Sequence, residues 1–181
     1  MRVMVIDGAP ADGRLSALAE AIAGELASTP ADTHVFQLRA LSIQPCLGCM
    51  ACMLRTPGLC AIQDDQQTLL REILRADRVL LLYPLVCGFM SALTKVFVDR
   101  LFPLELPYIE FQEGRMTHRL RYGRYPAWGF IVGSETGMTD EEFEIAADLN
   151  RHLASYYRSP IFLNKRSSIS PQEAAHAIVC D

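Results

Sequence analysis

Four of the chain's six cysteines lie close together in the stretch IQPCLGCMACMLRTPGLCAIQDD, residues 43–65. They are Cys46, Cys49, Cys52 and Cys60, with the spacing C-x2-C-x2-C-x7-C. Three thiolates on one tight turn can hold three corners of a 4Fe–4S cube, and the fourth thiolate completes the set. Zinc also accepts four cysteines, although structural zinc sites usually split them into two separated pairs. The third alternative is that no metal binds and the thiols are reactive or merely packed.

The composition limits what these thiols can be doing. The chain has 181 residues, of which 50% are hydrophobic, and a net charge of −4, which suits one globular domain over residues 1–181. The N-terminus MRVMVIDG has no signal-peptide pattern, and no apolar run reaches the ~18 residues of a membrane span. We therefore expect a cytoplasmic protein, and in a reducing cytosol closely spaced cysteines more often bind metal or act catalytically than form disulfides. The acidic balance also argues against a nucleic-acid partner.

Short apolar runs alternate with helical patterns along the chain. The runs predict five strands, at residues 2–7, 33–38, 79–84, 127–132 and 159–163. Between them, the spacing of apolar residues predicts helices from Leu15, over 69–74, over 91–102 and from about Thr139. Parallel neighbours need a helical crossover, so this alternation predicts a doubly wound α/β fold with a five-stranded parallel sheet.

Two segments do not fit this alternation. One is the cysteine segment, in which Asp64 and Asp65 are interpreted as the N-terminal cap of the following helix. The other, residues 103–126, carries five basic side chains: Arg115, His118, Arg119, Arg121 and Arg124. We interpret it as a solvated loop or a subunit contact, with contact to a negatively charged cofactor or redox partner as the alternative.

A ligand of such a sheet binds beyond the carboxyl ends of the strands, where the strand order reverses. Three glycine-containing loops leave such ends: GAPADGRLS at 8–16, YPLVCGFMS at 83–91 and GSETGM at 133–138. The first loop precedes a helix whose free N–H groups suit an anion, and the other two suit a flat ring held by backbone groups. The first loop is neither a Walker loop nor a GxGxxG fingerprint, which argues against the two commonest nucleotide motifs.

The sequence around these loops resembles a known family. The matching features are the cysteine segment ending in CxIxDD and the stretch ADRVLLLYPLVCGFMSALTKVFVDR. The shared positions are Ala76, Asp77, Pro84, Gly88, Lys95, Asp99 and Arg100. Over about residues 1–135 the chain resembles the flavodoxin-like NAD(P)H-dependent FMN reductases, in particular their iron–sulfur flavoprotein branch. The resemblance implies strand order 2-1-3-4-5, FMN bound by the three loops, a 4Fe–4S cluster on the four cysteines, and a homodimer or homotetramer.

By this resemblance, the cofactor-binding residues lie in the three loops. They are Gly8, Ala9, Pro10, Arg14, Leu15 and Ser16 in the first, Pro84, Leu85, Val86, Cys87 and Gly88 in the second, and Gly133, Ser134, Glu135, Thr136 and Gly137 in the third. Cys87 is interpreted as a small buried residue that could touch the ring. Two departures from the family pattern predict weaker or altered FMN binding. Asp12 adds a negative charge to a first loop poor in phosphate ligands, and Val86 replaces an aromatic residue.

The leading hypothesis is an FMN-dependent oxidoreductase that moves electrons between a reduced donor, the cluster and a small acceptor. The donor would be NAD(P)H or a ferredoxin-like protein, and no general acid or base is expected, because hydride transfers directly to a flavin. One alternative is a plain NAD(P)H:FMN or quinone reductase whose cysteines hold no cluster. The other is a degenerate flavodoxin-like domain that binds a partner and no flavin.

Overall fold

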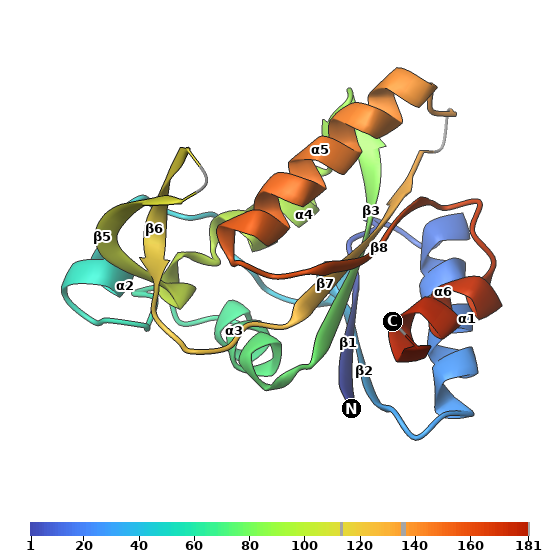
Figure 1. The fold of residues 1–181 in the computed structure, drawn as a ribbon, viewed down its shortest axis with the longest axis horizontal. Coiled ribbons are helices and arrows are strands. Elements are labelled where there is room, and N and C mark those ends of the chain that lie inside the picture. The colour runs from blue at the N-terminus through green and yellow to red at the C-terminus, as the bar shows by residue number, and fades with distance from the viewer. Residues whose placement is uncertain (113, 135–136, 181) are drawn as a thin grey trace.

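A five-stranded parallel sheet in the order β2-β1-β3-β7-β8 runs through the middle of the molecule (Figure 1). The structure, a computed structural model, describes residues 1–112, 114–134 and 137–180. The strands are β1 (Arg2–Asp7), β2 (Asp32–Gln37), β3 (Arg78–Val86), β7 (Ala127–Gly133) and β8 (Ile161–Arg166). This order is the predicted 2-1-3-4-5, and each predicted strand is present with its bounds shifted by a few residues at most.

Helices cover both faces of the sheet. Because successive side chains of a strand point to opposite faces, Val3 and Val5 pack against α1 (Arg14–Ala27) and α6 (Pro171–Cys180). Met4 and Ile6 belong to the other core, with α3 (Gln66–Arg75), α4 (Ala92–Asp99) and α5 (Asp140–Tyr156). The doubly wound fold is therefore confirmed, and α6 is a helix that the sequence patterns did not predict. Within the described residues, no helix is both long and apolar enough to span a membrane.

Thr139 begins α5 as the sequence predicts. Its hydroxyl accepts a hydrogen bond from the backbone N–H of Glu142, whose carboxylate accepts one from the Thr139 backbone N–H in return. This capping box satisfies two N–H groups that the first turn of a helix leaves free. The helix start beside the 133–138 loop is thereby fixed by local chemistry.

The strand β3 is longer than predicted and alters the second loop. It continues through Pro84 to Val86 and turns back into β4 (Phe89–Met90), which pairs with it antiparallel. Cys87 and Gly88 form the two-residue turn, with φ angles of 51° and 75°. The interpretation of Cys87 as a buried residue is wrong, because the turn places it at an exposed hairpin tip.

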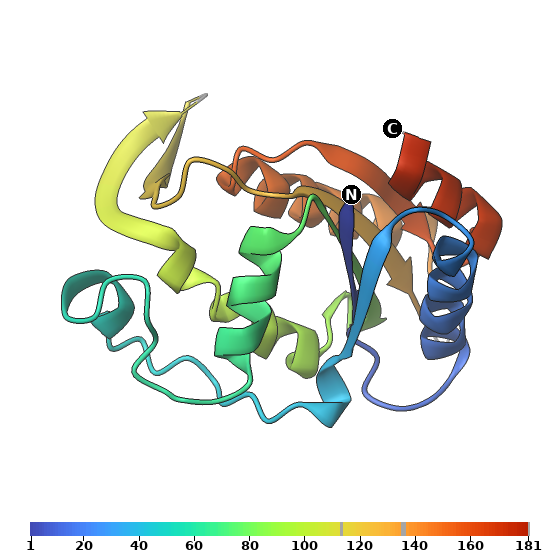
Figure 2. The same cartoon turned by 90° about the horizontal axis from the view of Figure 1, so that it is seen from below.

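Residues 103–126 form a hairpin and not the predicted loop. After η2 (Phe102–Leu104), β5 (Glu105–Gln112) and β6 (Arg115–Leu120) pair antiparallel. The hairpin lies beside α2 (Ala51–Leu54), at the end of the molecule opposite α1 (Figures 1 and 2). The remaining short element, η1 (Leu38–Ala40), follows β2.

A buried carboxylate lies at the base of this hairpin. Glu105 is 3% exposed, and its carboxylate accepts hydrogen bonds from the hydroxyls of Tyr157 at 2.8 Å and Tyr156 at 3.4 Å. Burial raises the pKa of Glu105, and the tyrosine hydrogen bonds offset only part of that effect. Ionisation of this side chain therefore opposes folding.

We expect Glu105→Gln to change how stability depends on pH. A glutamate whose pKa is raised in the folded state costs nothing while it is protonated in both states, and it costs stability as the pH rises past its ordinary pKa. The difference in free energy of unfolding between Glu105→Gln and the native chain should therefore shift in favour of the variant between about pH 4 and pH 7. Urea denaturation at several pH values measures it. The exposed Glu20→Gln is the control, and equal differences at all pH values would contradict the burial argument.

Candidate functional site

A cavity of about 520 Å³ lies at the carboxyl ends of the central strands. Loops after four strands form it, because parallel strands bring their carboxyl ends to one edge of the sheet. Seven predicted residues line it: Ala9, Pro10, Arg14, Leu15, Pro84, Gly133 and Ser134. Ala11 and Gly13 of the predicted first loop also line it, and so do Ser167 and Ser168, which the sequence reasoning did not select. The first, third and fourth predicted strands thus do converge on one cavity, and β8 contributes as well.

The other predicted residues lie outside the cavity wall. Leu85, Val86, Cys87 and Gly88 belong to the β3–β4 hairpin, and Gly8, Ser16 and Gly137 do not line the cavity either. Gly137 closes the third loop, since its carbonyl accepts a hydrogen bond from the Ser134 hydroxyl at 2.6 Å. Glu135 and Thr136 lie outside the described residues.

A buried carboxylate, Asp7, organises the first loop from below. It ends β1 and accepts hydrogen bonds from the Ala9 N–H at 2.9 Å and the Ser16 hydroxyl at 2.7 Å. It also pairs with Arg39, and this hydrogen bond raises the pKa of the arginine. Because the Ser16 hydroxyl is buried in this network, it holds the loop in place and does not face the cavity. Arg39 also pairs with Asp12 at 2.6 Å, which neutralises the charge that looked unfavourable in the sequence.

Gly8 locks the same loop against β3 and α4. Its N–H donates to the Leu82 carbonyl at 2.7 Å, and its own carbonyl accepts hydrogen bonds from the hydroxyls of Ser91 and Thr94. A Cβ at this position would lie 2.5 Å from Thr94 Oγ1 and 2.8 Å from the Leu82 carbonyl oxygen. Close backbone approach is therefore the reason for glycine here.

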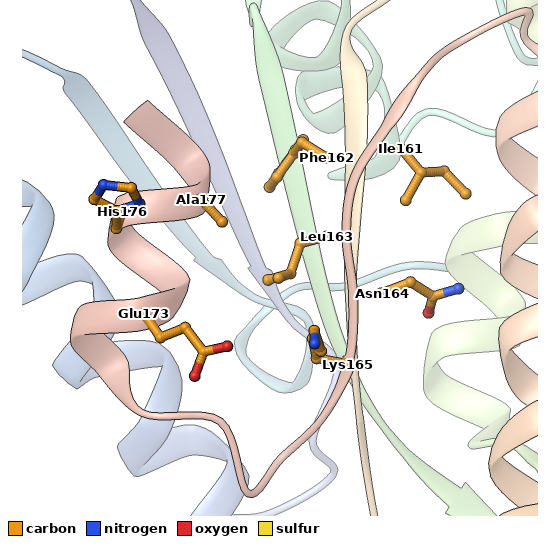
Figure 3. Close-up of a pocket in the computed structure, with 8 residues that line it drawn as sticks. All are labelled: Ile161, Phe162, Leu163, Asn164, Lys165, Glu173, His176 and Ala177. Atoms are coloured by element: carbon orange, nitrogen blue, oxygen red, sulfur yellow. The ribbon is translucent and has the colours of Figure 1, made fainter. Parts of the chain in front are cut away.

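A second cavity, of about 340 Å³, lies between β8 and α6 (Figure 3). Phe162 and Leu163 point into it from the strand, and Glu173 and His176 face it from the helix. None of its lining residues follows the carboxyl end of a strand. The rule that governs ligand sites in such sheets therefore favours the strand-end cavity.

The four predicted metal ligands lie on the segment around α2. Left-handed backbone at Gly48 and Met50, with φ angles of 62° and 55°, folds the chain between the cysteines. Cys46 and Cys49 are exposed, whereas Cys52 and Cys60 are partly buried. Burial raises the pKa of Cys52, and its electrostatic interactions with Cys60, Cys46 and Cys49 raise it further.

The arrangement of the sulfurs bears on which metal group they fit. Within the described residues, no three His, Cys, Asp or Glu side chains converge around a point that one metal ion could occupy. A single zinc ion would draw four sulfurs to within about 4 Å of one another. A 4Fe–4S cluster binds each thiolate to a different iron, so its ligands stand further apart. Four soft thiolate donors on one segment suit either group, and the compact spacing of the first three is the sequence argument for a cluster.

A buried ion pair anchors both ends of the cysteine segment. Asp64 pairs with Arg100 and accepts hydrogen bonds from the N–H groups of Gln44 at 2.9 Å and Gln66 at 3.1 Å. Arg100 donates in turn to the carbonyl oxygens of Gln44 at 2.9 Å and Ile62 at 3.3 Å. Burial alone would raise the pKa of Asp64, but the hydrogen bond from Arg100 and its other partners lower it overall.

The helix-cap interpretation of the two aspartates therefore needs correction. Asp65 occupies the position before α3, but its carboxylate accepts from the Ser42 N–H at 2.7 Å and caps no helical N–H. Asp64 does bond the first N–H of α3 while also holding Gln44 and Arg100. Both acids fasten the entrance of the cysteine segment to its exit.

The cysteine segment lies away from the strand-end cavity. No described residue of 43–65 lines the cavity, and α2 and α1 lie at opposite ends of the long axis of the molecule (Figure 2). The basic residues of 103–126 do not line it either. Arg121 instead donates to the carbonyl oxygens of Cys52 at 3.3 Å and Glu105 at 2.8 Å, which ties the hairpin to the cysteine segment.

Comparison with known proteins decides the family. Residues 1–122 match the family described as NADPH-dependent FMN reductase. The chain belongs to this family. An iron–sulfur flavoprotein of Methanocaldococcus jannaschii is 30% identical over 109 residues, covering 60% of this chain and 55% of that protein. One of Archaeoglobus fulgidus is 29% identical over 162 residues, covering 89% of this chain and 66% of that protein.

Both of these relatives are named iron–sulfur flavoproteins. The chain spans about half to two thirds of the length of the curated relatives it matches. Among solved structures, an NAD(P)H:quinone oxidoreductase from Methanothermobacter marburgensis superposes with a TM-score of 0.65 at 16% identity, covering 97% of this chain and 93% of that one. An azoreductase from Bacillus anthracis superposes with a TM-score of 0.66 at 12% identity, covering 98% of this chain and 91% of that one. The flavodoxin-like fold is thereby confirmed.

Gly8→Ala should destabilise this family member, while Gly24→Ala should not. The added methyl group at Gly8 overlaps Thr94 and the Leu82 backbone, and such overpacking costs about 1–3 kcal/mol of unfolding free energy. A methyl group at Gly24 meets nothing within 4 Å on an exposed turn of α1, where alanine is favoured by about 0.5–1 kcal/mol. Urea denaturation of both variants tests the contrast. Equal stability of the two would show that the loop moves freely away from β3.

Proposed function

We propose that this chain is an FMN-dependent oxidoreductase of the iron–sulfur flavoprotein type, which moves electrons between a reduced donor and a small acceptor. The observation that carries the proposal is the cavity built by the loops after β1, β3, β7 and β8. Its volume lies in the range of pockets for small molecules and cofactors, and its position is the one that flavodoxin-like sheets offer to a ligand. Membership of the FMN reductase family supports FMN as that ligand.

The phosphate end of FMN would lie at the start of α1. Arg14 is the first residue of this helix and lines the cavity, and the free N–H groups of the first turn favour an anion. Ser167 and Ser168 line the same cavity from the loop after β8. Their hydroxyl groups offset the scarcity of hydroxyl side chains in the first loop, which the sequence alone made a weakness.

The ring end would lie against Pro84 and the third loop. Bound FMN would supply the redox chemistry by accepting a hydride from a nicotinamide and releasing electrons to an acceptor. The protein needs no acid or base for this, so the role of Pro84, Gly133 and Ser134 is to orient the ring and to exclude water. NAD(P)H is the proposed donor, with a ferredoxin-like protein as the alternative.

The four cysteines are proposed to hold a 4Fe–4S cluster. Their spacing and the names of the relatives support this assignment. All six cysteines are free thiols, as suits a protein of the reducing cytoplasm. A cluster passes single electrons, so it would connect the flavin to acceptors that take one electron at a time.

The separation of the two sites supports an oligomer. No described residue of the cysteine segment lines the cavity, and α2 lies at the end of the molecule opposite α1, whose first residues do line it (Figure 2). A homodimer or homotetramer can place the cysteine segment of one subunit against the cavity of the next. Transfer between flavin and cluster would then cross a subunit boundary.

The visible spectrum of anaerobically purified protein tests the proposed function. Flavin bands on top of broad iron–sulfur absorption would support it in full. Flavin bands alone, together with NAD(P)H oxidation in the presence of FMN or a quinone, would instead support a plain NAD(P)H:FMN or quinone reductase without a cluster. Colourless protein after reconstitution with FMN, iron and sulfide would contradict it and favour a binding domain without cofactor.

Cys49→Ser should lose iron and keep FMN. One of four cluster ligands is removed, whereas the cavity contains no described residue of the cysteine segment. We expect iron per chain to fall severalfold while the FMN content stays within error of the native protein. Cys180→Ser, at an exposed cysteine far along the chain from the motif, is the control and should keep both. Loss of FMN in Cys49→Ser would contradict the separation of the two sites.

Arg14→Gln should weaken FMN binding. A charged hydrogen bond to phosphate contributes about 1.5–3 kcal/mol of binding free energy. Because Arg14 is exposed to solvent, we expect a loss near the lower value of this range, which corresponds to a rise of about tenfold in the Kd of FMN. Quenching of FMN fluorescence on titration with apoprotein measures the Kd. Arg71→Gln, on the exposed side of α3, should leave it unchanged. An unchanged Kd in Arg14→Gln would place the phosphate elsewhere.

A further inference from the structure

Arg100 carries a buried charge that its partners do not fully satisfy. The residue is 2% exposed, and Asp64, its counter-ion, has a side chain that is 6% exposed. The two terminal nitrogens of the guanidinium donate to Asp64, Gln44 and Ile62, but Nε has no hydrogen-bond partner among the described residues. A buried donor without a partner is costly and uncommon in proteins. Such a group requires a functional or structural explanation.

Arg100 reaches the part of the cysteine segment that carries Cys60, because its guanidinium donates to the carbonyl oxygen of Ile62, two residues after this cysteine. A neutral thiol is a weak acceptor, and a thiolate bonded to iron is a stronger one with negative charge. Iron binding at Cys60 would therefore create the acceptor that the buried cation lacks. The segment from Cys46 to Cys60 contains no acidic residue, so no nearby carboxylate of this segment competes for the charge.

We propose that Arg100 is a positioning residue for the iron–sulfur cluster, which fixes Cys60 and stabilises the negative charge of its iron-bound thiolate. The proposal rests on the proposed function, because it needs a cluster on the four cysteines. Groups that hydrogen-bond to metal ligands orient them and tune the metal, and hydrogen bonds to the sulfurs of a cluster raise its reduction potential. Asp64 supports this role, because its carboxylate pairs with the guanidinium and accepts hydrogen bonds from both ends of the cysteine segment.

The test needs variants that still fold. Arg100→Gln alone would leave Asp64 as a buried charge without a partner, which destabilises proteins strongly. The double variant Asp64→Asn/Arg100→Gln removes both charges and keeps groups able to form hydrogen bonds. Arg100→Lys keeps the charge and loses the planar fork. Arg121→Gln is the matched control, because Arg121 also supports the cysteine segment but bonds only backbone carbonyl oxygens.

Three measurements on the reconstituted proteins separate positioning from simple support. They are the rate of iron loss to a chelator, the midpoint potential of the cluster by EPR-monitored titration, and the melting temperature of the apoprotein. We expect the double variant to lose iron about tenfold faster, the typical effect of removing a group that supports a metal ligand. Its cluster should be reduced at a more negative potential, and Arg100→Lys should restore part of that shift. Arg121→Gln should keep the native potential.

Two results would overturn the inference while leaving the proposed function intact. One is a double variant with native iron loss and native potential. The other is an equal shift of potential in Arg121→Gln, which would mean that loosening the segment is sufficient. Failure of the native protein to assemble a cluster would overturn the inference together with the cluster assignment, and FMN binding measured in the same sample would show whether the flavin part survives.

Discussion

The parallel pairing of β1 with β3 and of β3 with β7 is the constraint on which the site depends. In this register Asp7 lies opposite Leu82, and Gly133 lies opposite Pro84, so β1 and β7 end at nearly the same level along β3. Their loops then meet without any long excursion. The contact of Gly8 with the Leu82 carbonyl is the tightest consequence, because two backbones approach where a side chain would not fit. The cavity therefore follows from strand register before any ligand is considered.

Two buried ion pairs fasten the functional segments to this sheet. Asp7 and Arg39 hold the first loop, and Asp64 and Arg100 hold the cysteine segment. A buried pair contributes little net stability, because desolvating two charges offsets most of their attraction. The pairs instead define geometry, since Asp7 accepts two directed hydrogen bonds from the first loop and Asp64 accepts one from each end of the cysteine segment. We infer that these pairs serve to fix position more than to add stability.

The sequence predicts the sheet well, because runs such as VLLLYP are apolar on both faces and the helices between them have a clear period. It does not predict α6, whose buried residues are mostly alanines and give little contrast with their neighbours. The β5–β6 hairpin was taken for a loop because its strands carry charges and exposed aromatic residues without strict alternation. Ser167 and Ser168 reach the cavity through the register of β8, which no local pattern reveals. The roles of Asp7 and Arg100 depend on long-range partners and are invisible for the same reason.

The direction in which the cysteine segment leaves the sheet has the largest functional consequence. Residues after η1 lead away from the strand ends to the hairpin, where Arg121 and the Asp64–Arg100 pair hold them. The proposed cofactor binding at the cavity and the proposed metal binding at the cysteines would thus involve separate sets of described residues within one chain. A ligand at one site can influence the other only through the packed core between them or through a neighbouring subunit. Under the proposed function, contact between subunits would be the more direct route, because it would bring the two sites together without rearranging a core that is already closely packed.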